Sequence, residues 1–308
     1  MTCTTSIPAG TIIKHHGSSS SSSSSPASVT TLQIVKRLQQ IHSFLVSMPS
    51  LKPGDAVNRT FGELVTLCIG VYPTSTVRSV VNHPLTQSLL PSLRTLAANG
   101  EYLLEKTWAE ALTQEALKKT NKQSTRNLAT GLLQEFVYYD NYEQLVKMEL
   151  HCLLGVDAHL DRVVFVGSGP LPLSSILMAS HCQLPVTNID YCEDAIRIST
   201  DLVHSLHLQD KMHFFCGDAT EYPFYQDADV VILGALVGAD GDAKISFLDR
   251  IAENMKSGAI LLVRSAHALR TVLYPPLDEE GIPSTLVPVL EMHPQNEVVN
   301  SVILFKRR

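Results

Sequence analysis

The sequence predicts an α/β protein in which an all-α helical bundle precedes a mostly parallel, doubly wound sheet. Up to about residue 158, apolar side chains recur at the three- and four-residue spacing of amphipathic helices. Beyond that point, short continuous apolar runs alternate with helical patterns, which is typical of a sheet covered on both faces. Eight consecutive serines at 18–25 mark a stretch that cannot bury a core. We therefore expect a disordered tail over residues 1–28, a helical bundle domain over 29–158 and a sheet domain over 159–308.

Composition excludes several classes of protein. The chain has 308 residues and a formal net charge of −6, which argues against a general nucleic-acid binder because such proteins carry a basic surplus. No apolar run approaches the roughly 18 residues that a membrane-spanning helix needs. The six cysteines form neither a CxxC pair nor a zinc-like spacing with histidine, and the first residues lack a secretory pattern. We expect a cytoplasmic protein with no nucleic-acid partner, no membrane partner and no bound catalytic metal.

Apolar spacing predicts four helices in the first part of the chain, and proline sets their limits. Thr30 or Thr31 can cap the first helix, and Pro49 ends it. Pro84 and Pro91 are expected to interrupt the chain before the third helix. The helices are expected at about 30–48, 60–67, 92–116 and 128–153.

Six short apolar runs predict six strands in the second part of the chain. They lie at 162–166, 185–190, 212–216, 229–233, 259–264 and 299–305. Helical patterns separate most of them, at 173–182, 193–206 and 243–255. Because strands and helices alternate, most strands should be parallel, with their carboxyl ends along the edge where such sheets bind ligands.

Two of these strand ends carry the first evidence for a ligand. The segment Gly167-Ser168-Gly169-Pro170 follows the first strand, and glycine lets the backbone turn tightly and approach a ligand closely. Asp190 ends the second strand, about 20 residues further on, where a carboxylate can accept hydrogen bonds from ribose hydroxyls. Together these positions favour a ligand that contains a nucleoside.

A departure from the dinucleotide pattern narrows the choice of ligand. Pro172 stands where GxGxxG has its third glycine, which disfavours a pyrophosphate packed on a helix N-terminus. S-adenosylmethionine has no phosphate and tolerates this change. Asp218-Ala219 closes the third strand, where an acid can meet the adenine amino group. The second part is thus predicted to be a Rossmann-like class I S-adenosylmethionine-binding domain, with both aspartates acting only as loop caps as the alternative.

Longer motifs resemble the nicotianamine synthase family. They are VGSGPLPL at 166–173, ALVG at 235–238 followed by Asp240 and Lys244, RSAHALR at 264–270 continuing to Tyr274, and HP at 293–294 followed by VVNSV at 298–302. In the helical part, LKP at 51–53, FGELV at 61–65 and YYDNY at 138–142 also fit. The resemblance covers about residues 30–308.

The resemblance implies an aminocarboxypropyl transferase. Members of this family condense three S-adenosylmethionine molecules into nicotianamine, a metal chelator with an azetidine ring, and release three methylthioadenosines. S-adenosylmethionine is then the substrate, and no catalytic metal is expected. The resemblance adds Tyr191, Leu236 and Val237 to the residues expected to bind S-adenosylmethionine. It also points to metal homeostasis and is compatible with a homodimer.

Such a reaction needs a base near the attacking amine. The amine must lie in line with the methionine-side carbon of the sulfonium, and it must be neutral, whereas an α-amino group is largely protonated at pH 7. By resemblance, Glu105 matches a catalytic glutamate that deprotonates the amine, and Tyr142 matches a catalytic tyrosine that orients it. The alternatives are a solvated Glu105 paired with Lys106, a shift of the glutamate role by one turn to Glu101, and bundle packing for Tyr142.

Cations are needed to hold the carboxylates of the growing product. Arg264 and Arg270 are expected to clamp them, with structural salt bridges as the alternative. No ligand set converges on His267 or His293, so we expect no catalytic metal there. The competing functions are a small-molecule methyltransferase that releases S-adenosylhomocysteine, an inactive S-adenosylmethionine-binding protein and an NAD-dependent oxidoreductase. The identity of the product separates them.

Overall fold

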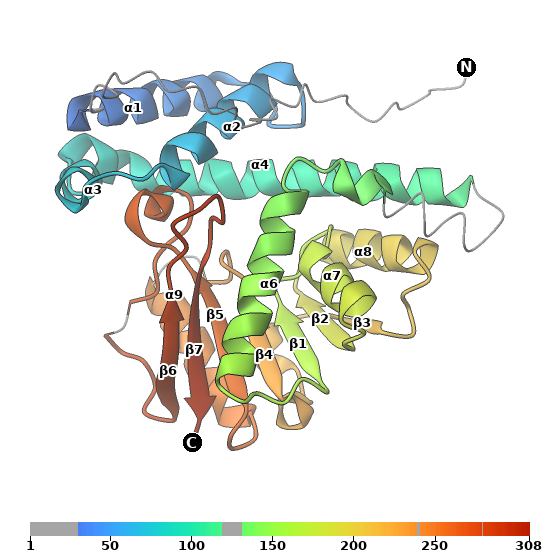
Figure 1. The fold of residues 1–308 in the computed structure, drawn as a ribbon. Helices are drawn as coiled ribbons and strands as arrows, with labels where there is room; N and C mark the ends of the chain where they lie inside the picture. The colour runs from blue at the N-terminus through green and yellow to red at the C-terminus, as the bar shows by residue number, and fades with distance from the viewer. Residues whose placement is uncertain (1–29, 119–130, 239–240, 279) are drawn as a thin grey trace, which may run out of the picture.

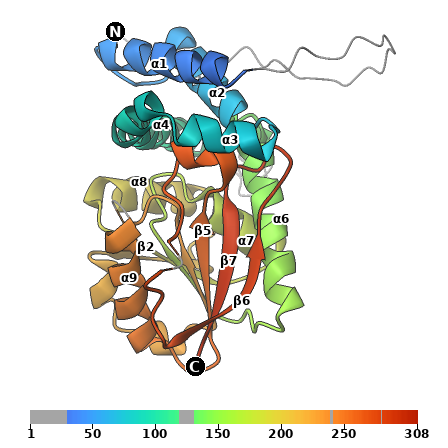
Figure 2. The same ribbon diagram turned by 90° about the vertical axis from the view of Figure 1, so that its left-hand side faces the viewer.

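The computed structural model describes residues 30–118, 131–238, 241–278 and 280–308. The predicted tail at 1–28 lies outside the described residues. Figures 1 and 2 show a helical layer lying across one end of a sheet, with further helices on both sheet faces. The α/β fold class predicted from the alternation of strands and helices is confirmed.

The sheet has seven strands in the order β3-β2-β1-β4-β5-β7-β6. Strands β1 to β5 are parallel, whereas β7 runs antiparallel to both β5 and β6. The strand order reverses between β1 and β4, and ligands of open α/β sheets bind beyond the carboxyl ends at such a point. The strands are β1 Val163–Val166, β2 Val186–Asp190, β3 Met212–Cys216, β4 Val230–Leu233, β5 Ile260–Ser265, β6 Leu286–Met292 and β7 Ser301–Arg307.

All six predicted strands are present, and β6 is an additional one. Pro288 lies inside β6, and a proline within an apolar run argues against a central strand. The structure places β6 at the edge of the sheet, with a register shift between Pro288 and Leu290. An edge strand tolerates the missing backbone donor, which explains why the sequence pattern did not reveal it.

Alternate residues of the central strands face different helices. Val163 and Phe165 of β1 belong to a buried cluster with α6, α7 and α8, whereas Val164 and Val166 pack on the opposite face with α9. This period of two explains why the strands read as continuous apolar runs. The helices are α6 Tyr139–Gly155, α7 Leu173–His181, α8 Glu193–Ser205 and α9 Gly241–Asn254.

The helical layer consists of α1 Thr31–Ser47, α2 Asp55–Ile69, α3 Thr74–Val81 and α4 Pro84–Leu117. Thr30 caps α1 through a capping box with Gln33, as the sequence predicts. The layer shares a buried cluster with the 3₁₀ turn η3, Ala268–Val272, which follows β5. Helix α4 extends across the end of the sheet (Figure 1), and this helix carries the candidate catalytic glutamate.

Three predictions for the helices are wrong in their limits. Helix α4 begins at Pro84 rather than at residue 92, because proline fits the first turn, and it continues through Pro91. Pro91 and Gln87 are exposed, so water can satisfy the carbonyl that loses its partner. Helix α3 was missed, and α2 begins before residue 60. Within the described part of 128–153, the chain leaves helical structure at 135–138 before α6 begins.

Among the described residues, we find no helix that is both long and apolar enough to cross a membrane.

Candidate active site

The turn after β1 brings three elements together. Gly167 and Gly169 have φ values of +77° and +67°, which L-residues other than glycine rarely adopt. A Cβ atom on Gly167 would lie 2.4 Å from Cγ2 of Val237, in the loop after β4. A Cβ atom on Gly169 would lie 3.0 Å from Oε2 of Glu105, on α4. The glycines thus allow the β4 loop and α4 to approach the turn.

Asp190 stabilises this turn as well as its own loop. Its Oδ2 atom accepts a hydrogen bond from the backbone nitrogen of Gly169 at 2.9 Å, and its Oδ1 atom accepts one from Cys192 at 3.0 Å. Each carboxylate oxygen has a second lone pair, and no further hydrogen bond to either oxygen is found among the described residues. Asp190 is therefore placed where the sequence predicts a nucleoside-binding acid.

The other predicted S-adenosylmethionine contacts surround these strand ends. Asp218 is exposed and caps the 3₁₀ turn η1, Ala219–Glu221, by accepting from the backbone nitrogen of Thr220 at 2.8 Å. Tyr191 and Leu236 leave 86% and 41% of their surface uncovered, an apolar surface available to a ligand. Ala219, Ser168 and Pro170 are buried, and no hydrogen-bond partner of Ser168 Oγ is found among the described residues.

Glu105 and Tyr142, predicted from separate elements, meet in the structure. Glu105 is only 7% exposed, and the Tyr142 hydroxyl on α6 donates to its Oε1 atom at 2.8 Å. The remaining oxygen, Oε2, is the one that lies against the Gly169 turn. Burial raises the pKa of Glu105 well above its usual range, and the negative charge of Glu101 raises it further. The solvated-surface alternative for Glu105 is wrong, and Lys106 pairs with Asp194 instead.

Glu101 forms a second part of the same cluster. The Tyr274 hydroxyl donates to its Oε2 atom at 2.8 Å, and the Tyr142 hydroxyl lies 3.5 Å from its Oε1 atom. Burial is the main cause that raises the pKa of Glu101. Sequence reasoning gave no role to Tyr274 and treated Glu101 only as an alternative to Glu105. The two glutamates are four residues apart, which places them on one face of a helix. This spacing was the signal that both side chains belong to the same cluster.

Arg264 lies at the end of β5 and is bound by protein groups. It is 5% exposed, and its Nε and Nη2 atoms donate to the two carboxylate oxygens of Glu149 at 2.7 and 3.0 Å. Nη2 also donates to Ser174 Oγ at 2.7 Å, and the guanidinium lies 4.9 Å from the centre of the Phe165 ring. Its hydrogen bonds therefore form the structural salt bridge that the sequence left as an alternative. Its charge still lowers the pKa of both glutamates of the cluster.

Arg270 holds loops in place. It is 2% exposed, and its guanidinium donates to the backbone carbonyls of Val298 at 3.1 Å and Asn296 at 2.7 Å. Among the described residues, no hydrogen bond from Arg270 to the Glu101–Glu105 cluster is found. Backbone carbonyls engage Nε and Nη2 of Arg270, which favours a structural role over the predicted clamp.

His267 and His293 share one hydroxyl group. Both Nδ1 atoms lie within hydrogen-bond distance of Ser301 Oγ, at 3.0 and 2.9 Å, and the rings stack 4.6 Å apart. Burial lowers the pKa of His267 to about 4, and the charge of Arg270 lowers it as well. Over the described ranges of the chain, no group of three or more His, Cys, Asp or Glu side chains could hold a metal ion.

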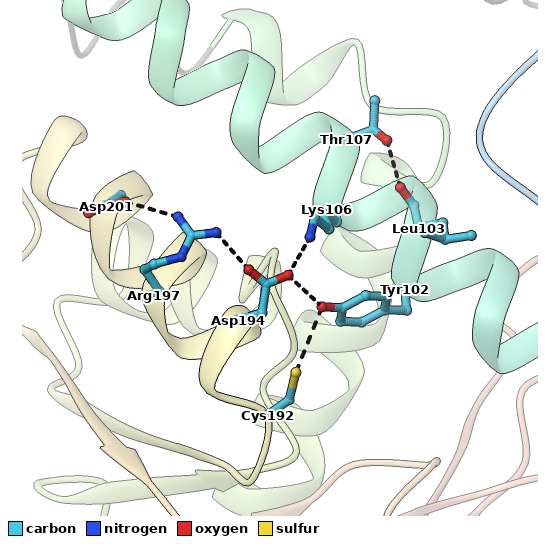
Figure 3. Close-up of polar contacts among 8 residues, drawn as sticks. All are labelled: Tyr102, Leu103, Lys106, Thr107, Cys192, Asp194, Arg197 and Asp201. Atoms are coloured by element: carbon cyan, nitrogen blue, oxygen red, sulfur yellow. Dashed lines mark hydrogen bonds and ion pairs between the residues drawn. The ribbon is translucent and has the colours of Figure 1, made fainter.

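A polar contact fixes α4 against the loop that follows Asp190 (Figure 3). Asp194, in the first turn of α8, accepts hydrogen bonds from Lys106 and from the Tyr102 hydroxyl of α4, the latter at 3.1 Å. Arg197 donates to its other oxygen at 2.6 Å. The hydrogen bonds from Lys106 and Arg197 lower the pKa of Asp194 to about 2. This contact joins the helix that carries Glu105 to the first turn of α8, just after the loop that follows Asp190.

Comparisons with known proteins agree with the resemblance read from the sequence. A family model described as "Nicotianamine synthase protein" matches residues 27–308. Nicotianamine synthase 1 of Arabidopsis thaliana is 33% identical over 281 residues, which cover 89% of this chain and 84% of that protein. Crystal structures of MtNAS, one of a variant with S-adenosylmethionine and one with MTA and tNA, both have a TM-score of 0.72. They are 20% and 21% identical, covering 89% and 90% of this chain and 97% of each solved chain. The chain therefore belongs to the nicotianamine synthase family.

Proposed function

We propose that this protein condenses three S-adenosylmethionine molecules into nicotianamine and releases three methylthioadenosines. The observation that carries the proposal is the position of Glu105, which Tyr142 holds with its free oxygen against the Gly169 turn. Family membership supports it, as does the relative of similar fold that was solved with S-adenosylmethionine. S-adenosylmethionine is the substrate and its amino-acid arm is the transferred group.

The strand ends supply the binding site for the nucleoside. Asp190 accepts from the ribose hydroxyls with its free lone pairs, and Asp218 meets the adenine amino group. Tyr191, Leu236 and Val237 cover the apolar faces of the ligand. Gly167, Ser168, Gly169 and Pro170 form the tight turn on which the methionine part of the substrate rests. Together these residues orient the sulfonium toward α4.

The chemical step is a displacement at carbon. Glu105 takes a proton from the attacking ammonium group, and the neutral amine attacks the methionine-side carbon next to the sulfonium. A carbon–nitrogen bond forms while the carbon–sulfur bond breaks, and its electron pair stays on sulfur in methylthioadenosine. Tyr142 orients Glu105 through the 2.8 Å hydrogen bond. Glu105 is buried, which keeps bulk water from competing with the amine at this carboxylate.

The substrate's carboxylates need a compensating charge. Arg264 supplies it from the end of β5, although Glu149 neutralises part of that charge. Arg270 supports the site indirectly, by holding the segment at 296–298 beside η3. This division of roles differs from the paired clamp expected from the sequence.

Product analysis tests the proposed function. The purified protein is incubated with S-adenosylmethionine alone, and the products are identified by mass spectrometry. We expect methylthioadenosine and nicotianamine without any added acceptor. A two-unit product would retain the chemistry and correct the number of transfers. Absence of turnover, or S-adenosylhomocysteine formed only with an added acceptor, would contradict the proposal and favour a methyltransferase.

The proposed product also gives the protein a biological context. Because nicotianamine chelates metals, we propose a role in metal homeostasis, with the protein located in the cytoplasm and assembled as a homodimer. Light scattering of the purified protein tests the homodimer, for which a mass of one chain would be the contradicting result.

A further inference from the structure

Each transfer leaves a proton in a buried site, and the proposed mechanism gives it no exit. The attacking ammonium loses one proton before every transfer, and the new secondary ammonium must lose another before it can attack in turn. Glu105 is buried and can hold only one of these protons. A second proton acceptor is therefore needed for repeated transfers.

The structure places a second carboxylate, Glu101, within reach of the Tyr142 hydroxyl. Tyr142 lies between the two glutamates, with its hydroxyl 2.8 Å from Oε1 of Glu105 and 3.5 Å from Oε1 of Glu101. The Tyr274 hydroxyl donates to Oε2 of Glu101 at 2.8 Å and keeps the Glu101 carboxylate oriented. The Glu105–Tyr142–Glu101–Tyr274 cluster therefore forms one continuous chain of hydrogen-bonding groups.

We propose that Glu101 receives, through the Tyr142 hydroxyl, the proton that Glu105 takes from the attacking amine. Glu105 gives its proton to the phenolic oxygen while the phenolic proton passes to Glu101, so that Tyr142 ends unchanged and neutral. Glu101, which is partly exposed, then releases the proton to solvent. Glu105 is a carboxylate again and can take the next proton. Glu101 is thus a relay residue that acts through Tyr142, and this inference rests on the proposed function.

The groups around Glu101 favour a state in which the carboxyl groups of Glu101 and Glu105 together hold one proton. Glu101 is faced by Glu105 from its own helix, by Tyr142 of α6, by Tyr138 just before α6, by Arg264 from β5 and by Tyr274 after η3. Burial raises the pKa of both carboxyl groups, and the charge of Glu101 raises that of Glu105 further. Two such neighbours titrate as a unit, so one proton is readily shared between them.

The substitution Glu101→Gln tests the relay because it keeps the size of the side chain and removes the acceptor. We expect kcat to fall roughly 10²-fold, the scale of a lost acid–base group, while binding of S-adenosylmethionine is retained. The one-transfer product should accumulate. The acid limb of the kcat/KM profile should move to lower pH, because Glu105 loses the neighbouring charge that raises its pKa. Loss of packing alone would not move this limb, and accumulation of the one-transfer product separates the relay from a purely electrostatic effect of Glu101.

Matched variants make the test decisive. Glu110→Gln makes the same change at an exposed position of α4 and should behave as wild type. Glu101→Asp restores a carboxylate and should recover part of kcat. If Glu101→Gln fails to fold, Tyr274→Phe carries the test, since it removes only the hydrogen bond to Oε2 and should lower kcat several-fold.

The outcomes separate this inference from the proposed function. Wild-type kcat and an unmoved acid limb in a folded Glu101→Gln protein, or unchanged kcat in Tyr274→Phe, would overturn the relay while leaving nicotianamine synthesis intact. Failure of the wild-type protein to make any aminocarboxypropyl product would overturn the proposed function itself.

Discussion

At the scale of single residues, one glycine decides how closely α4 approaches the turn after β1. Gly169 adopts a positive φ and faces Oε2 of Glu105, so a side chain there adds backbone strain and displaces the base. Glu105 owes its position to this approach and to the hydrogen bond from Tyr142. The proposed catalytic geometry therefore depends on the absence of a single methyl group at position 169.

We predict that Gly169→Ala lowers kcat at least tenfold and destabilises the fold by about 1–2 kcal/mol, the cost of a left-handed conformation in other residues. Gly258→Ala is the matched control, because Gly258 has a φ of +84° with no atom within 4 Å of an added Cβ. It should lose similar stability and keep kcat. Denaturant unfolding and initial rates check both variants, and equal loss of kcat in the two would contradict the assignment.

At the scale of elements, α4 is the link between the helical layer and the sheet. It contributes Glu101 and Glu105 to the cluster, and it holds the start of α8 through Lys106 and Tyr102 (Figure 3). The side chains of Lys106 and Asp194 are 29% and 38% exposed, so solvent screens their ion pair. We infer that this pair matters more for the position of the Asp190 loop than for global stability.

We predict that Lys106→Met raises KM for S-adenosylmethionine several-fold and changes the free energy of unfolding by less than about 1 kcal/mol, as is usual for exposed pairs. Lys118→Met, which removes a more exposed ion pair at the end of the same helix, should leave KM unchanged. Steady-state kinetics and denaturant unfolding check both. A large loss of stability with unchanged KM would contradict this role for the contact.

At the scale of the whole molecule, a nucleoside ligand that binds only the folded state should stabilise it. We predict that S-adenosylmethionine raises the melting temperature, by an amount equivalent to about 2.7 kcal/mol at a concentration 100 times its Kd. NAD should have no effect, because Pro172 replaces the third glycine of the dinucleotide pattern. Thermal unfolding with each ligand checks this, and stabilisation by NAD alone would favour an oxidoreductase.

The central strands of the sheet could be predicted from the sequence, whereas one edge strand and the start of helix α4 could not. Strands β1, β4 and β5 are buried along their whole length, so their apolar runs were readable, whereas the edge strand β6 was hidden by Pro288. The helix predicted from the sequence was shorter than α4, because Pro91 normally marks a break in a helix. The exposed carbonyl that loses its partner makes this proline tolerable. Local sequence patterns predict buried elements well. They do not show where an edge strand or an exposed helix position tolerates a proline.

The candidate site shows the same division. Gly167, Gly169 and Asp190 were readable because strand ends have a fixed spacing, and Glu105 and Tyr142 were found through the family resemblance. The partners of Arg264 and Arg270 could not be predicted from the sequence. Glu149 and the carbonyls of residues 296 and 298 are brought to these arginines only by tertiary packing. The role of a buried arginine depends on such partners, and the spacing of residues along the sequence does not reveal them.

The central claim is that the amino-acid arm of S-adenosylmethionine, and not its methyl group, is transferred. The most direct measurement uses two samples of S-adenosylmethionine, one labelled with carbon-13 in the methyl group and one in the aminocarboxypropyl arm. We predict that the arm label appears in the amino-acid product and the methyl label only in methylthioadenosine. A methyl label in any product other than methylthioadenosine, together with S-adenosylhomocysteine, would contradict the account.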